Sequence, residues 1–187
     1  MAAHNFDYCI GTANSAFKKV VSGMLNSSGF ISAGDGTSTP LLLRTLRSVQ
    51  PWLAVIDTEL PPGNIEELAD IIEADNLSAA IFISTRGRSL KNYVQLDWPV
   101  EPRVLTAVAE AVCNEFARKK KLQNRINDLQ RKLNERKLIE KAKGIIADNL
   151  GFNEADAYNY LREKSMERRI SMAEMAGLVV TAPGLFS

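Results

Sequence analysis

"LIEKAKGIIADNLGFNEADAYNYLREKSMERR", residues 138–169, reads as two helices joined by a short turn. Apolar residues recur at helical spacing up to Leu150, and Gly151 stands where a helix usually ends. Asn153 is a favoured N-cap residue for the second helix, with the acidic Asp156 three positions later. Gly144 is the anomaly, because a glycine inside a helix costs about 1 kcal/mol relative to alanine.

A third helix follows this stretch. Ser171 and Glu174 make the pattern of a capping box in front of "MAEMAGLVV", and Pro183 ends the segment. A bundle of about 45 residues is marginal by itself, so we expect it to depend on the helix before it.

The helix before it is long. Residues 103–149 contain no proline and only one glycine, and an apolar seam recurs at spacings of 4, 3 and 4. We call this the heptad seam: Leu122, Ile126, Leu129 and Leu133. Arg136 and Glu140 break its register. A seam of this kind predicts dimerisation through a coiled coil, and an intramolecular helical hairpin is the alternative.

The first hundred residues follow a different pattern, in which short apolar runs alternate with amphipathic helices. We predict strands over 8–13, 52–57 and 79–84 and helices over 15–30, 41–49 and 64–76, and we read the glycine-rich residues 34–40 as a surface loop. Apolar strands that alternate with helices indicate an α/β fold with a parallel sheet covered on both faces. Polar residues that end the strands would gather at the carboxyl edge of that sheet.

Composition places the chain among soluble globular proteins. It has 187 residues, of which 45% are hydrophobic and 24% charged. Cys9 and Cys113 lie far apart without metal-site spacing, so we expect two structural thiols. No apolar run reaches the roughly 20 residues of a membrane span, and no signal peptide is evident, which predicts a cytoplasmic protein.

Charge is unevenly distributed along the chain. Residues 1–100 hold 7 Lys and Arg against 10 Asp and Glu, whereas residues 117–182 hold 15 against 9, a net charge of +6. A basic segment suggests an anionic partner, although a solvated helix face would have the same composition.

Residues 136–176 closely resemble an ANTAR domain. The motif residues are Ala142, Lys143, Gly144, Ala157, Tyr158, Leu161, Arg162, Ser165, Met166 and Ala176. The chain as a whole resembles the regulators of amidase and nitrate-assimilation operons. That resemblance implies a flavodoxin-like pseudo-receiver over residues 1–115, a coiled-coil linker over 116–135 and a three-helix ANTAR domain over 136–182. It also implies that the last domain binds RNA in transcription antitermination.

The receiver resemblance is incomplete at its functional positions. Asp57 matches the phosphoacceptor and Ser84 the Ser/Thr switch, but the acidic pair that holds Mg²⁺ is replaced by Thr12 and Ala13, and the conserved lysine by Trp98. Phosphoryl transfer needs a cation to neutralise developing charge, and Mg²⁺ needs several oxygen ligands. We therefore expect a pseudo-receiver, with Asp57 capping the following loop rather than accepting phosphate.

Gly144 has two possible explanations. Ala142 lies on the apolar stripe of the helix, whereas Gly144 lies about 200° further round, off that stripe. Another helix could cross there, or the RNA could approach the bare backbone. The candidate RNA-binding residues are Arg136, Lys137, Lys143, Gly144, Tyr158, Arg162, Lys164, Arg168 and Arg169. Guanidinium groups can clamp phosphate or stack on unpaired bases, and Tyr158 and Tyr160 could offer stacking surfaces if they are not part of the core.

We therefore expect a non-enzymatic regulator that binds leader-RNA hairpins as a dimer. The only histidine, His4, permits no histidine-based triad or two-histidine metal site, and we expect neither cofactor nor metal. A phosphorylated receiver using Asp57 and a protein-interaction adaptor without specific RNA binding are the alternatives. No helix-turn-helix recognition pattern supports DNA binding.

Overall fold

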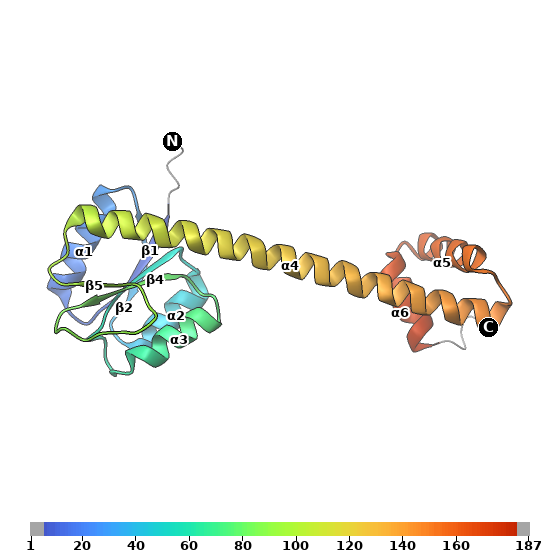
Figure 1. The fold of residues 1–187 in the computed structure, drawn as a ribbon, viewed down its shortest axis with the longest axis horizontal. Coiled ribbons are helices and arrows are strands. Elements are labelled where there is room, and N and C mark those ends of the chain that lie inside the picture. Colours follow the sequence, from blue (N-terminus) through green and yellow to red (C-terminus); the bar gives the residue numbers. More distant parts are fainter. Residues whose placement is uncertain (1–5, 183–187) are drawn as a thin grey trace. The chain divides into compact units, whose positions relative to one another are not determined.

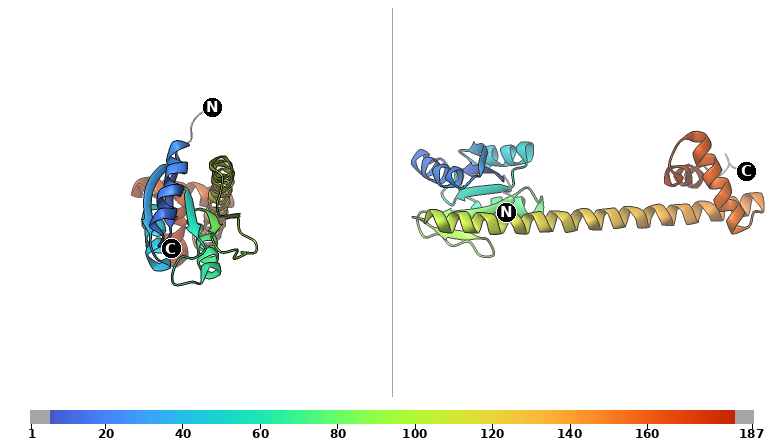
Figure 2. Two further views of the ribbon diagram at one scale, coloured as in Figure 1. Left: turned by 90° about the vertical axis from the view of Figure 1, so that its left-hand side faces the viewer. Right: turned by 90° about the horizontal axis from the view of Figure 1, so that it is seen from above.

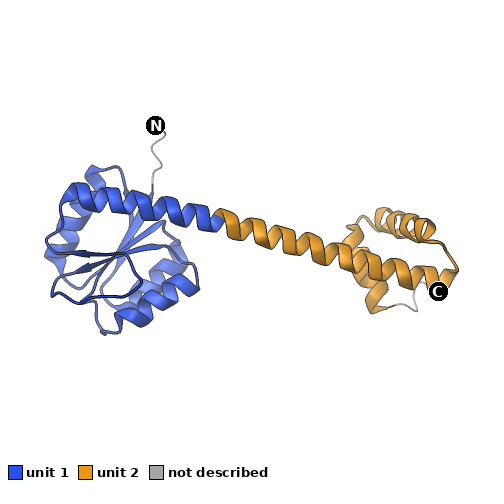
Figure 3. Ribbon diagram, viewed as in Figure 1, with its two compact units in different colours: residues 1–120 blue, residues 121–187 orange. Residues whose placement is uncertain are grey.

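A computed structural model describes residues 6–182 of the chain, so the predictions for His4 and Pro183 lie outside the described residues. The chain divides into two compact units, residues 1–120 and 121–187 (Figure 3). The helix α4, Pro102–Leu150, begins in the first unit and ends in the second.

The first unit is built on a five-stranded parallel sheet (Figure 1). Its strands are β1 (Asp7–Gly11), β2 (Ile31–Gly36), β3 (Leu53–Asp57), β4 (Ala79–Ser84) and β5 (Gln95–Asp97), in the spatial order β2-β1-β3-β4-β5. All five residues of β3 are buried, as expected for a central strand covered on both faces. The predicted parallel α/β fold is confirmed.

Helices cover both faces of the sheet (Figures 1 and 2). One core joins the sheet to α1 (Ser15–Ser27) and the first turns of α4. The opposite core joins it to α2 (Thr39–Val49) and α3 (Ile65–Ala74). Cys9 and Cys113 are free thiols in these two opposite cores, and burial raises their pKa values to about 11 and about 12. The expectation of two structural thiols is confirmed.

The edge strands β2 and β5 are absent from the sequence-based prediction. The surface loop predicted over residues 34–40 is wrong at both ends, because residues 34–36 end β2 and residues 39–40 begin α2. A Cβ at Gly36 would lie 2.5 Å from the backbone of Leu42, so the close passage of α2 requires a glycine there. Residues 85–94 contain no helix.

The second unit contains the end of α4, α5 (Glu154–Arg168) and α6 (Met172–Thr181). The predicted boundaries are confirmed: Gly151 has a φ of +66°, and the Asn153 side chain accepts a hydrogen bond from the Asp156 N–H at 2.9 Å. Ser171 and Glu174 form a reciprocal capping box in front of α6.

A separate core holds the three helices of the second unit together. Its fully buried apolar residues are Ala142, Ile146, Ala157, Leu161, Met175, Ala176 and Val179. The predicted stripe of α4 lies in or against this core, so the bundle does use the long helix for its packing. Within residues 6–182, every helix is too short or too polar to span a lipid bilayer.

Candidate functional site

Asp57 ends β3 at the carboxyl edge of the sheet and is only 3% exposed. The Thr12 hydroxyl donates to Asp57 Oδ2 at 2.9 Å, and the Glu59 N–H donates to Oδ1 at 3.0 Å. Protein donors therefore satisfy both carboxylate oxygens. The hydrogen bond from Glu59 confirms that Asp57 caps the loop that follows β3.

The residues around Asp57 do not fit a magnesium site. Thr12 presents a hydroxyl where a receiver has a carboxylate, and the described residues include no cluster of three His, Cys, Asp or Glu side chains suited to a metal ion. Trp98, in place of the lysine, packs on Phe17 with ring centroids 5.3 Å apart. The Ser84 hydroxyl is buried, and no partner for it is found among residues 6–182. Arg86, which follows β4 at this edge, pairs with Glu59 at 3.3 Å, so no contact among the described residues joins a positive charge to Asp57.

Lys143, a predicted RNA-binding residue, is held inside the second unit. Its side chain is 10% exposed, and its ammonium donates to Glu140 at 2.9 Å and to Glu154 at 2.7 Å. The hydrogen bond from Glu154, followed by that from Glu140, raises the pKa of Lys143, while Lys143 lowers the pKa of Glu154. The ion pair with Glu154 joins α4 to the first turn of α5, so Lys143 positions these helices rather than offering a free charge.

Gly144 lies on the exposed side of α4, where an added Cβ would meet no atom within 4 Å. Ala142 is fully buried in the core, as expected. No packing contact within the described chain therefore accounts for the glycine. Lys137 and Lys141 lie seven and three residues before Gly144, on the same side of the helix, and both are exposed.

We call Lys137, Lys141 and Gly144 the α4 outer face. Sequence reasoning missed Lys141, although its spacing of four residues from Lys137 would have placed both on one side of the helix. Arg136, also exposed, instead lies three residues after Leu133, on the line of the heptad seam.

A second surface follows α5. Tyr158, Arg162 and Met166 recur every four residues, and the tyrosine is 42% and the methionine 67% exposed. We call these three residues the α5 stripe. Tyr158 therefore lies outside the core, which resolves the ambiguity in its sequence-based assignment. Arg169 follows at the helix C-cap, in the left-handed conformation with a φ of +55°.

The other predicted cations of α5 are Lys164 and Arg168. The Lys164 ammonium pairs with Glu167 at 2.8 Å and lies 5.7 Å from the centre of the Tyr160 ring. Tyr160 in turn packs edge-on against Phe152. Arg168 is exposed in the last turn of α5. The structure thus separates the predicted RNA-binding residues. Tyr158 and Arg162 lie on the α5 stripe, Lys137 and Gly144 on the α4 outer face, and Lys143 and Lys164 pair with carboxylates within the unit. Arg136, Arg168 and Arg169 are exposed outside these groups.

The heptad seam is exposed along its whole length. Its four side chains are between 47% and 65% exposed, and none contributes to a core of the described chain. Asp128 beside the seam pairs with Arg131 and Lys132 of its own helix, so these charges are already compensated within one chain.

Known proteins resemble the second unit, the first unit and most of the chain. Residues 127–180 match the ANTAR domain. The transcriptional regulatory protein PdtaR of Mycobacterium tuberculosis is 22% identical over 169 residues, which cover 86% of this chain and 82% of PdtaR.

Two solved structures resemble the first unit. The anti-anti-sigma factor PhyR from Bartonella quintana matches with a TM-score of 0.54 at 16% identity, over 66% of this chain and about half (53%) of PhyR. The signal receiver domain of a modulated diguanylate cyclase from Desulfovibrio desulfuricans G20 matches with a TM-score of 0.54 at 18% identity, over 61% of this chain and 98% of that domain. At such identities the likeness establishes the fold alone, which is that of a receiver domain.

Proposed function

We propose that this chain, which carries an ANTAR domain behind a receiver-like fold, is an RNA-binding regulator of transcription antitermination. The observation that carries the proposal is the match of residues 127–180 to the ANTAR domain, in a segment with a net charge of +6 over residues 117–182. The same segment exposes an aromatic ring and a guanidinium group side by side on α5.

The α5 stripe has the chemistry required to contact unpaired bases. The Tyr158 ring and the Arg162 guanidinium each offer a flat surface on which a base can stack, and Met166 adds an adaptable apolar contact. Single-stranded loops expose the bases that such side chains can reach, whereas the deep groove of an RNA helix does not. The stripe therefore suits the loop of a hairpin rather than its stem.

The α4 outer face suits the phosphate backbone. Lys137 and Lys141 supply two exposed positive charges, and Gly144 leaves the helix surface one turn beyond Lys141 without a side chain. Lysine is a common phosphate-binding residue, and phosphate contacts provide most of the salt-dependent affinity of nucleic-acid complexes. Lys143 contributes indirectly, by fixing α5 to α4 through Glu154.

Dimerisation through the heptad seam would place two such bundles on one tether. An exposed apolar seam of four residues is stabilised when a second helix covers it. Two weak RNA sites on one tether gain avidity, because the second binding event becomes intramolecular. Two hairpins held in this way would compete with the folding of a terminator and allow transcription to continue.

The receiver-like unit would then act without phosphate chemistry. Thr12 and the Glu59 N–H satisfy Asp57 in place of a metal ion, so the unit is better suited to bind a regulatory protein than to accept a phosphoryl group. The geometry of this edge does not support phosphorylation of Asp57.

Binding to a two-hairpin RNA tests the proposal. We would compare the wild-type chain with an Arg162→Ala/Arg169→Asn variant, in which asparagine tolerates the left-handed conformation at position 169. An Arg44→Ala/Lys91→Ala variant removes the same charge from exposed positions of the first unit and serves as the matched control.

We expect the α5 variant to lose at least about tenfold in affinity, since each aromatic or guanidinium contact to a base contributes about 1–3 kcal/mol. The control should bind as the wild type does. Equal losses in both variants would mean that only the total charge matters, and the adaptor alternative would then replace RNA recognition.

A further inference from the structure

The sheet of the first unit has an incomplete edge next to β4. The last strand, β5, has only three residues, which pair with Phe82, Ile83 and Ser84. The first half of β4 therefore has β3 on one side and no strand on the other. Residues 85–94, which lead from β4 to β5, form no helix that could cover this edge.

Backbone groups point outward from this edge. Ala79 donates its N–H to Trp52 on the β3 side, whereas Phe82 donates to Val94 on the β5 side. Because alternate residues of a parallel strand bond to opposite neighbours, the N–H and C=O groups of Ser78 and Ala80 face the side where β5 is missing. We find no hydrogen bond to those groups from residues 6–182. The buried Ser78 hydroxyl also lacks a partner within that range.

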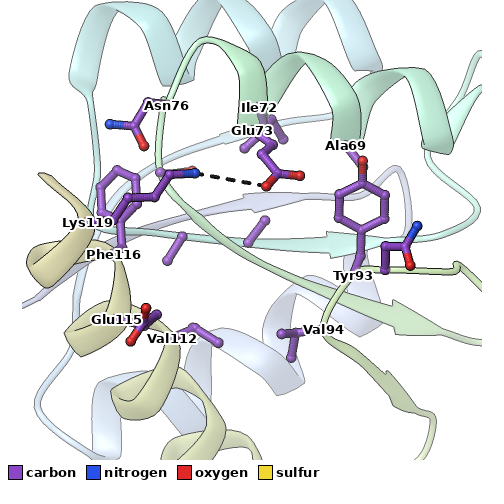
Figure 4. A pocket seen from close by; sticks show the side chains of 14 residues that line it. Ala69, Ile72, Glu73, Asn76, Tyr93, Val94, Val112, Glu115, Phe116 and Lys119 are labelled. Atoms are coloured by element: carbon purple, nitrogen blue, oxygen red, sulfur yellow. Dashed lines mark ion pairs between the residues drawn. The ribbon is translucent and has the colours of Figure 1, made fainter. Parts of the chain in front are cut away.

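A cavity of about 240 Å³ lies against this unpaired edge (Figure 4). Its floor includes Ser78 and Ala80. One wall comes from α3 and the other from α4, with Tyr93 and Val94 at the side, and its main apolar members are Ala69, Ile72, Val94, Val112 and Phe116. Side chains of an added strand would point alternately toward the two walls, so apolar side chains at alternate positions would all contact one wall, such as the α4 wall with Val112 and Phe116.

The loop beside the cavity is fixed in place. The Tyr93 hydroxyl donates a hydrogen bond to Asp70 on α3, which raises the pKa of Tyr93 to about 12. The Tyr93 ring also packs edge-on against Phe82, with centroids 5.7 Å apart. These two contacts fix the loop at the side of the cavity.

The charged side chains around the opening of the cavity favour a basic ligand. Residues 65–75, which contain α3, carry five acidic residues and no basic residue. Glu73 and Glu115 face the opening from the two walls, and Lys119 pairs loosely with Glu73 at 3.9 Å across it (Figure 4). Two carboxylates against one ammonium leave the rim negative.

We propose that this groove, which we call the β4-edge groove, binds an extended segment of a partner protein as an additional strand. The segment carries apolar side chains at alternate positions and a basic residue at the rim. Strand addition of this kind obtains affinity from main-chain hydrogen bonds and specificity from the side-chain pockets. A second copy of this chain is a poorer occupant, because pairing two such edges would bring two acidic α3 helices together.

Fluorescence anisotropy with a labelled peptide, acetyl-Lys-Val-Ser-Val-Lys-amide, tests the proposal on the full-length chain. The key variant is Ala80→Pro, which removes the outward N–H without breaking a bond to β3, and proline is tolerated at such edge positions. We expect the peptide to bind and the variant to weaken binding about tenfold, through the lost hydrogen bond and the strand geometry. A peptide with glutamate in place of both lysines should bind more weakly.

A second variant keeps the test independent of how Ala80→Pro folds. Val112→Lys places a positive charge on the α4 wall, where it opposes both apolar contact and a basic ligand, whereas Val104→Lys, at an exposed position of the same helix, is its control. Only the first should weaken binding. Absence of binding at about 1 mM peptide, or binding that neither groove variant changes, would overturn the proposal. Self-association of the chain that Ala80→Pro abolishes would instead assign the groove to a second copy and overturn it as well.

Discussion

Gly144→Ala should raise the stability of the second unit while it weakens RNA binding. A Cβ at this position meets no atom within 4 Å, so the substitution adds no clash. Alanine is favoured over glycine inside a helix by about 1 kcal/mol, and the structure offers no compensating loss. One kilocalorie corresponds to an increase of about fivefold in protection from hydrogen exchange. At the same time the new methyl group would stand on the surface that we assign to the RNA backbone.

Gly177→Ala provides a matched control. A Cβ at Gly177 would lie 3.8 Å from Leu138 Cδ2, which is an ordinary van der Waals contact, so this substitution inside α6 should stabilise the unit by a similar amount. It lies outside both the α5 stripe and the α4 outer face, and RNA affinity should not change.

Native-state hydrogen exchange of the α5 amides and RNA titration are the two assays. We expect both variants to slow exchange and only Gly144→Ala to weaken RNA binding. Loss of protection in Gly144→Ala would show that α4 has a packing partner at this point. Unchanged RNA affinity would refute the proposal that RNA contacts the helix backbone at Gly144. It would also refute the assignment of the α4 outer face as an RNA-binding surface.

Three further substitutions test other contacts. Ile146→Ala should destabilise the second unit by about 2–5 kcal/mol in urea unfolding, because Ile146 is fully buried; a loss below about 1 kcal/mol would show that the core can collapse around the gap. The carboxylate of Glu154 has a pKa lowered by Lys143, so its contribution to stability is present above the ordinary glutamate pKa of about 4.3 and declines as the pH falls toward the lower folded value. Glu154→Gln should therefore flatten this part of the acid unfolding profile, and an identical profile would mean that the ion pair adds no stability. Leu129→Asp should convert a dimer into a monomer in sedimentation equilibrium, whereas an unchanged mass would exclude the heptad seam as the interface.

The sequence predicted the second unit well because its signals are local. Asn153, Gly151 and the pair Ser171 and Glu174 each satisfy backbone groups within three or four residues, so the residue types alone locate the helix ends. The three central strands were equally recognisable, since burial on both faces makes them continuous apolar runs.

The edge strands were missed because nothing local identifies them. β2 reads "ISAGDG", with two glycines, one aspartate and a single buried position, and β5 has only three residues. Both are strands because β1 and β4 present free edges to them, which is a property of the folded sheet and not of these residues.

The site residues show the same limit. Lys143 looked like a free cation because Glu154, its partner at 2.7 Å, lies on another helix and eleven residues away. The hydrogen bond between Thr12 and Asp57 likewise joins residues 45 positions apart. The sequence placed both residues at the carboxyl edge of the sheet, but their contact requires the packed strands.

A transcription assay tests the proposed function most directly. The template would carry two hairpins ahead of an intrinsic terminator, and a matched template would carry the same stems with scrambled loops. We expect the full-length chain to increase read-through on the first template alone, and the Arg162→Ala/Arg169→Asn variant to lose that increase. Read-through that the protein leaves unchanged on the first template, or raises equally on both, would contradict antitermination through recognition of the hairpin loops.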